Sequence, residues 1–207
     1  MGSPVNLSAY SEDQYDALRE ISNIAMGRAA DTLARLLDRF IRLPVPQVRI
    51  VQAALVADTL RELVAGEASV TVIRQAFSGR LRGEALVFFC GETYAELADL
   101  LGHVGDSAVD HEELVLDLSN LLVGATIGGI AEQLGYELGY SPPSIIADRT
   151  TMDLVLEAKS VPWSQAVLLS LNLRVEGKAF LCHVLAFWPD EALRALRDAI
   201  DRFLETV

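Results

Sequence analysis

The strongest constraint on the fold is an internal repeat. Two short segments read almost as copies of each other, each with an acidic residue, an asparagine three positions later and a proline further on. The residues are Glu20, Asn23 and Pro46 in the first copy and Asp117, Asn120 and Pro143 in the second. An acid and an amide three residues apart on a helix point the same way, so each copy offers both groups to one partner. The sequence therefore predicts a protein with two related sites.

The repeat extends beyond these motifs. A glycine-led segment, Gly79 to Phe89, and the helical pattern after it recur at Gly177 to Phe187, again followed by a helical pattern. Helix, strands and closing helix return in the same order, as duplication of one unit would give. We therefore predict a single domain made of two repeats, at about residues 11–103 and 110–205, related by a pseudo-two-fold axis. The short acidic segment 104–110 would join them.

Each repeat is predicted to contain one long helix and several strands. In the first, apolar residues at three-and-four spacing indicate a helix from about 12 to 40, with Ser11 as its N-cap. The other elements expected there are strands at 48–56, 70–77 and 81–90 and a short helix at 92–101. Those expected in the second repeat are a helix at about 112–138, a strand at 144–147, a hairpin of 166–175 and 178–187, and a helix at 190–204. Long helices beside antiparallel hairpins indicate an α+β fold.

Composition narrows the class of protein. The 207 residues are 51% hydrophobic and 22% charged, enough to bury a core. The apolar runs are too short for a membrane span and no signal peptide is apparent, so we expect a cytoplasmic protein. The net charge of −12 disfavours nucleic acid as a partner. A protein partner with a basic or neutral surface suits this charge better.

The cysteines and histidines suggest no redox or metal chemistry. Cys90 and Cys182 lie within apolar runs and are expected to be buried, reduced thiols. The three histidines, at positions 103, 111 and 183, lack the spacing of metal ligands. We therefore propose no metal site.

Whether the paired residues can contact a partner depends on whether they lie on the exposed or the buried side of their helix. On a helical wheel, Glu20 and Asn23 lie away from the apolar stripe and near Gly27, so they should be exposed. Asp117 and Asn120 share their stripe with Gly124 and Gly128. A glycine inside a helix is less favourable than alanine by roughly 1 kcal/mol, so these positions need a reason. They could form a floor on which another molecule docks, or a surface for close helix packing with Asn120 as a buried core amide.

The residues that carry these features resemble a known family. The segment Leu18 to Ala30 and the run Ser141 to Pro143 resemble the CheC family of chemotaxis phosphatases (CheC, CheX and FliY type). Its mark is a Glu-x-x-Asn helix followed by proline at this spacing. The first copy matches fully, and the second has Asp117 in place of glutamate. Gly27, Pro46, Gly124 and Pro143 are the residues expected to support the two motifs.

The resemblance implies hydrolysis of the aspartyl phosphate of a CheY-type response regulator. Asn23 and Asn120 would orient the attacking water, while Glu20 and Asp117 would pair with a lysine of the regulator. The regulator would supply Mg²⁺, so this chain needs no cofactor of its own. The resemblance also implies a CheD-type deamidase as a further partner. Internal duplication favours a monomer over the dimers formed by single-site relatives.

The two sites should differ in strength. Aspartate is one methylene shorter than glutamate, and a misplacement of about 1 Å can reduce a rate on the order of a hundredfold when positioning is the mechanism. We therefore predict that the Asp117/Asn120 site is the weaker. An alternative is a non-catalytic module, related to flagellar-switch middle domains, that binds a phosphorylated regulator or another chemotaxis protein. The presence of both asparagines argues against it, because binding alone would not need a water-orienting amide at each site.

Overall fold

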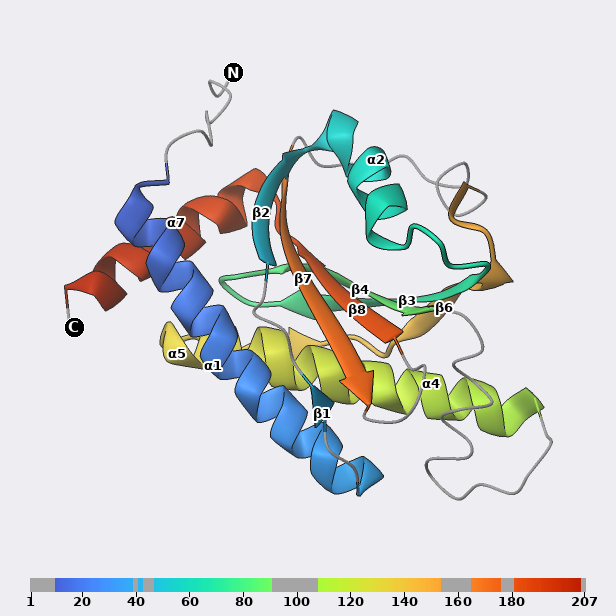
Figure 1. Ribbon diagram of the computed structural model, residues 1–207. Coiled ribbons are helices and arrows are strands. Elements are labelled where there is room, and N and C mark those ends of the chain that lie inside the picture. The colour runs from blue at the N-terminus through green and yellow to red at the C-terminus, as the bar shows by residue number, and fades with distance from the viewer. Residues whose placement is uncertain are drawn as a thin grey trace.

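The structure is a computed structural model that describes residues 10–38, 41–42, 47–90, 108–153, 165–175 and 181–205. Helices and antiparallel strands are mixed along the chain, which confirms the predicted α+β class (Figure 1). The elements of the N-terminal half are α1 (Glu12–Leu37), β1 (Ile41–Arg42), β2 (Gln47–Gln52), α2 (Ala53–Leu63), β3 (Val70–Ser78) and β4 (Gly83–Cys90). Those of the C-terminal half are α4 (Ala108–Val123), the π-helical turn η1 (Gly124–Gly128), α5 (Gly129–Gln133), β5 (Gly139–Tyr140), β6 (Ser144–Thr150), β7 (Gln165–Val175), β8 (Leu181–Phe187) and α7 (Asp190–Leu204).

The strands form one sheet that joins the two halves of the chain. Its order is β1-β7-β8-β4-β3-β5, with β2 also paired to β7 and β6 also paired to β3. The central pair, β4 with β8, runs from Glu84 opposite Phe187 to Cys90 opposite Leu181. At each edge the strands are exchanged, because β1 and β2 pair with β7 of the C-terminal half while β5 and β6 pair with β3 of the N-terminal half. Each half therefore supplies strands that complete the sheet of the other.

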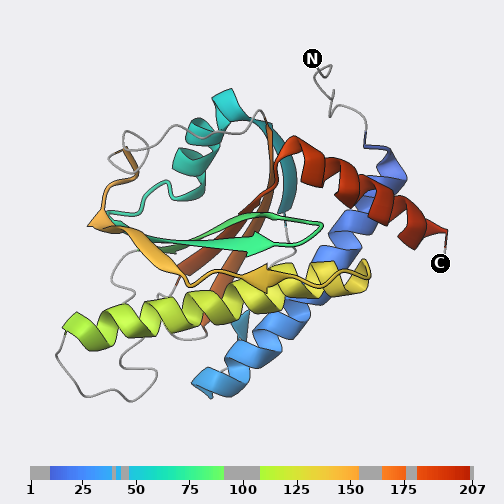
Figure 2. The ribbon, with the colours of Figure 1, turned by 180° about the vertical axis from the view of Figure 1, so that it is seen from behind.

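The sheet separates two hydrophobic clusters. On one face lie α1, α4, α5 and α7, and on the other lies α2, as the two opposite views show (Figures 1 and 2). Strand residues alternate between the faces, as the pleat requires. Ile73, Val87 and Val184 pack under the helix layer, whereas Val72, Phe88 and Leu185 pack under α2. The long helices that carry the predicted motifs are thus fixed on one face of the sheet.

Helix α1 begins and ends where local chemistry dictates. The Ser11 hydroxyl accepts a hydrogen bond from the Gln14 backbone N–H at 3.2 Å, and the Ser11 backbone N–H donates to Gln14 Oε1 at 2.9 Å. This reciprocal pair is a capping box and confirms Ser11 as the N-cap. At the other end, Asp38 adopts a left-handed conformation with φ of 48°. The helix therefore ends at Leu37, before the predicted limit of 40.

Two of the predicted elements were wrong in extent. The strand expected at 48–56 gives way to helix α2 at Ala53, because Val56, Leu60 and Val64 recur at helical spacing and bury one stripe. The helix expected at 112–138 begins at Ala108 and ends at Gln133, with the π-helical turn inside it. The strands and the last helix that were predicted beyond position 143 are confirmed in outline, and α7 has the predicted bounds. The helix expected at 92–101 lies outside the described residues.

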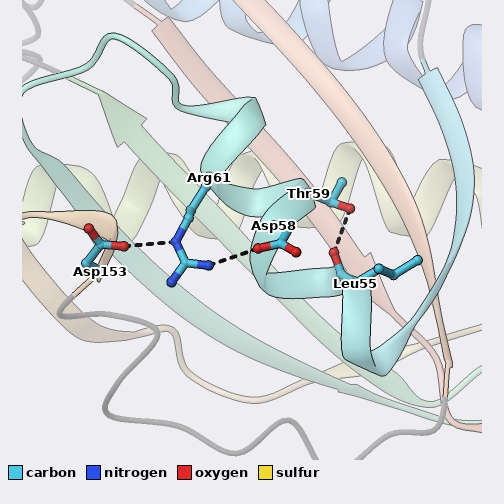
Figure 3. Close-up of polar contacts among 5 residues, drawn as sticks. All are labelled: Leu55, Asp58, Thr59, Arg61 and Asp153. Atoms are coloured by element: carbon cyan, nitrogen blue, oxygen red, sulfur yellow. Dashed lines mark hydrogen bonds and ion pairs between the residues drawn. The ribbon is translucent and has the colours of Figure 1, made fainter.

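Helix α2 is tied to the segment after β6 by an exposed ionic contact (Figure 3). Arg61 Nε donates to Asp153 Oδ1 at 2.9 Å, and an Arg61 terminal nitrogen donates to Asp58 Oδ1 at 3.0 Å. The hydrogen bond to Asp153 raises the pKa of Arg61. Within the helix, the Thr59 hydroxyl donates to the Leu55 carbonyl at 2.8 Å. Exposed ion pairs contribute little free energy, so the apolar stripe is what holds α2 to the sheet.

Both cysteines are buried thiols outside any disulfide, as predicted. They lie on adjacent strands but on opposite faces, since Cys182 belongs to the cluster under the helix layer and Cys90 to the cluster under α2. Burial raises the pKa of the Cys90 thiol to about 12. One helical stretch, Glu112–Gln133, is long and apolar enough to cross a bilayer by length and composition, but more than half of it is buried inside this fold. A core helix of a globular domain has the same properties.

Candidate functional site

The first acid and amide pair lies on the exposed side of α1. Leu18, Ile21 and Ala25 are buried in the cluster of the helix layer, which turns Glu20 and Asn23 outwards. Their predicted exposure is confirmed. Together with Asp16 and Arg19 they line a shallow surface depression of about 360 Å³. Asn23 is exposed, and none of the described side chains hydrogen bonds to its carboxamide.

The second pair lies on the exposed side of α4, but its amide has a partner. Asp117 and Asn120 are exposed. Asn120 Oδ1 accepts a hydrogen bond at 2.7 Å from Nε2 of Gln75, a β3 residue whose side chain is 1% exposed. The same Gln75 nitrogen donates to the Ser141 carbonyl oxygen at 2.9 Å. Asn120 is thus hydrogen-bonded to the core without being a buried core residue.

The glycines below the two pairs divide into two kinds. A Cβ added at Gly27 or Gly124 would meet nothing within 4 Å. At Gly128 a Cβ would lie 2.7 Å from the Tyr140 hydroxyl oxygen, and at Gly129 it would lie 3.0 Å from the Ala25 Cβ. Close packing therefore explains the later two glycines and leaves Gly27 and Gly124 unexplained. Those two, one turn beyond each asparagine, fit the expectation of an open floor.

The proline of the second motif follows a segment that is fastened to β3. The Ser141 backbone N–H donates to the Ala76 carbonyl at 2.9 Å, and the Ala76 backbone N–H donates to the Ser141 hydroxyl at 3.0 Å. Pro143 is half-buried at the end of this segment, directly before β6. The asparagine and the proline end of the motif therefore meet at β3. Pro46 of the first motif lies outside the described residues.

Gln75 is the residue of this site that sequence reasoning missed. It lies within a strand and belongs to the half of the chain that does not carry Asn120. One signal could have indicated it. Asn172, another amide on a predicted strand, follows Gln75 by the same offset that separates Asn23 from Asn120.

The arrangement offers binding and positioning groups. A carboxylate accepts hydrogen bonds and pairs with cations, while a carboxamide both donates and accepts. Within the described part of the chain, no group of three or more histidine, cysteine, aspartate or glutamate side chains could hold a metal ion. The side chains of each pair can therefore accept and donate hydrogen bonds and pair with a cation.

The chain is similar in sequence to known proteins. The sequence pattern of the CheC-like family matches residues 14–50, a stretch that contains Glu20, Asn23 and Pro46. The chain is also 29% identical to the CheY-P phosphatase CheC of Bacillus subtilis over 147 residues, which is 66% of this chain and 68% of that protein. The chain is therefore similar to CheC-like proteins.

Solved structures show a likeness in fold over most of the chain. FliY of Thermotoga maritima matches with a TM-score of 0.71 at 21% identity, covering 94% of this chain and 99% of that one. The FliM middle domain from H. pylori matches with a TM-score of 0.59 at 11% identity, covering 92% and 99%. At these identities the likeness shows a shared fold and carries no activity with it.

Proposed function

We propose that this protein hydrolyses the aspartyl phosphate of a CheY-type response regulator. The observation that carries the proposal is the presence of two exposed acid and amide pairs, each above a glycine whose outer side is open. The similarity to a CheY-P phosphatase from Bacillus subtilis supports the same reaction class. The α1 pair lies within the matched stretch.

An acyl phosphate is already activated, so little chemistry is asked of this chain. The regulator would hold the Mg²⁺ that neutralises the phosphoryl oxygens. Asn23 and Asn120 would orient water in line with the phosphorus atom, and Glu20 and Asp117 would fix the docking position by pairing with a cation of the regulator. The open surfaces at Gly27 and Gly124 leave room for the regulator to approach the helix backbone.

The proposal is tested by mixing a catalytic amount of the protein with a phosphorylated CheY-type regulator and following its decay. We expect faster decay with the wild-type protein and the uncatalysed rate with the double variant Asn23→Ala/Asn120→Ala. Thr32→Ala/Glu112→Ala is a matched control, since it truncates one exposed polar residue on each of the same helices. Equal rates for the asparagine variant and the control would refute the proposal.

A second candidate function is supported by the fold. The likeness to the FliM middle domain favours a non-catalytic module that binds a phosphorylated regulator or another chemotaxis or flagellar-switch protein. The decay assay separates the two functions, because a module would bind the regulator and leave its phosphoryl lifetime unchanged. The exposure of both asparagines favours the enzyme.

A further inference from the structure

Asn120 contacts a buried amide, that of Gln75, which has no role in the mechanism proposed above. Gln75 lies on the helix-facing side of β3, between Ile73 and Phe77, which are also buried on that side. Its Nε2 bonds both Asn120 and the Ser141 carbonyl, whereas its Oε1 has no partner among the described residues. A buried polar atom without a partner lowers stability, so an apolar residue would suit the core better. This points to a role in the site.

The hydrogen bonds determine which way Asn120 faces. A backbone carbonyl only accepts, so the Gln75 group that faces Ser141 must be its nitrogen. The Asn120 atom that meets this nitrogen must in turn be an acceptor, namely Oδ1. The Asn120 nitrogen is consequently the atom turned away from Gln75.

The Ser141 carbonyl, which accepts a hydrogen bond from Gln75, belongs to a backbone segment that is itself held in place. Ser141 is held to Ala76 through both its backbone N–H and its hydroxyl, next to Gln75 on the same strand. Gln75 therefore connects a fastened backbone carbonyl to an exposed asparagine. On α1, by contrast, no described side chain restrains Asn23. The two motifs both carry an asparagine but differ in how firmly its amide is held.

We propose that Gln75 is a positioning residue for Asn120, holding its carboxamide in one orientation before the regulator docks. This inference rests on the proposed function. A side chain that is ordered beforehand loses less entropy when the complex forms, and its bound geometry is reached more often. The effect should appear in kcat, since Gln75 is buried and makes no contact with the partner.

The test isolates the second site. In an Asn23→Ala background only Asn120 remains, and there Gln75→Met should lower kcat about tenfold with little change in KM, because it keeps the volume and removes the donor. In an Asn120→Ala background the same substitution should leave kcat unchanged. Thr71→Val is the matched control, since it removes a buried polar group of the same strand that bonds Asp148 and the Arg149 backbone instead. A loss of kcat that is equal in both backgrounds would overturn the inference.

A second measurement does not depend on catalysis. In the wild-type protein, the side-chain amide protons of Gln75 should exchange slowly with solvent by NMR, and the Asn120 amide should show a high order parameter. Gln75→Met should lower that order parameter, and Thr71→Val should not. If Gln75→Met does not fold, rapid exchange of the Gln75 amide in the wild-type protein would still overturn the inference. Failure of the proposed function looks different, because the double asparagine variant would then be as active as the wild type.

Discussion

The two motif-bearing helices each carry an acid and an asparagine at the same spacing, yet their surroundings differ. On α1, Glu20 and Asn23 lie on an uninterrupted α-helix, and no described side chain holds the amide. On α4, the helix changes to a π-helical turn at Gly124, and Asn120 is bonded to Gln75. A sequence repeat thus copies the exposed groups without copying what supports them.

This difference separates two contributions to a site. In the proposed mechanism, the acid would determine how well a partner is held, and the amide would determine how often water is placed correctly. The α1 site has the longer acid and the freer amide, while the α4 site has the shorter acid and the restrained amide. We therefore expect the α1 site to bind the regulator more tightly and the α4 site to place water correctly more often once the regulator is bound.

The largest expected effect comes from removing one asparagine at a time. Because the rates of the two sites add, each single variant reports the share of the site that it removes. Asn23→Ala should reduce kcat/KM by more than about tenfold, since the short Asp117 reduces what the remaining site can do. Asn120→Ala should reduce it by less than about twofold. Steady-state dephosphorylation of the regulator measures both, and a larger loss from Asn120→Ala would reverse the ranking.

Restoring the missing methylene should strengthen the second site. In the Asn23→Ala background, Asp117→Glu is expected to raise kcat/KM by up to about tenfold, mainly through a lower KM, because the acid regains its reach. The reciprocal change Glu20→Asp in the Asn120→Ala background should raise KM at the first site. Both are measured by varying the regulator concentration. If Asp117→Glu leaves KM unchanged, the shorter acid does not explain any difference between the sites.

Much of this comparison was available from the sequence, because it depends on local patterns. The capping box at Ser11, the bounds of α7 and the exposure of Asn23 follow from residues within one or two turns of one another. Helix α2 was missed because its first residues continue an apolar run that also suits a strand. Local patterning could not distinguish the two structures there.

The support of the second site depends on a contact across the chain. Gln75 reaches Asn120 because α4 of one half lies over β3 of the other. A polar residue inside a strand gives no sign of which helix will cover it. Gln75 and Asn172 occupy corresponding positions of the two repeats, and this spacing is visible in the sequence. The sequence does not show that such a strand residue lies beside a motif helix, since that requires the order of the strands in the sheet.

Glycine substitutions should sort the open floor from the packed contacts. Gly27→Ala and Gly124→Ala are each expected to stabilise the protein by about 0.5–1 kcal/mol, because alanine favours the helix and its Cβ meets open space. Gly129→Ala should destabilise it by a similar amount, since the Cβ would press on Ala25 of α1. Urea denaturation gives the free energies of unfolding. Stabilisation by Gly129→Ala would show that the helix crossing is looser than these distances imply.

The smallest effect should come from the exposed ion pair between α1 and α5. A terminal guanidinium nitrogen of Arg28 on α1 lies 2.8 Å from Oε2 of Glu132 on α5, and both side chains are more than half exposed. Solvent and salt screen such a pair, so a double-mutant cycle of Arg28→Ala and Glu132→Ala should give a coupling free energy below about 1 kcal/mol that decreases as salt is added. The rates at the two sites should not change, because buried contacts such as Gly129 against Ala25 already hold the helices together. A coupling above about 2 kcal/mol, or a loss of activity at one site only, would show that the ion pair sets the relative position of the two sites.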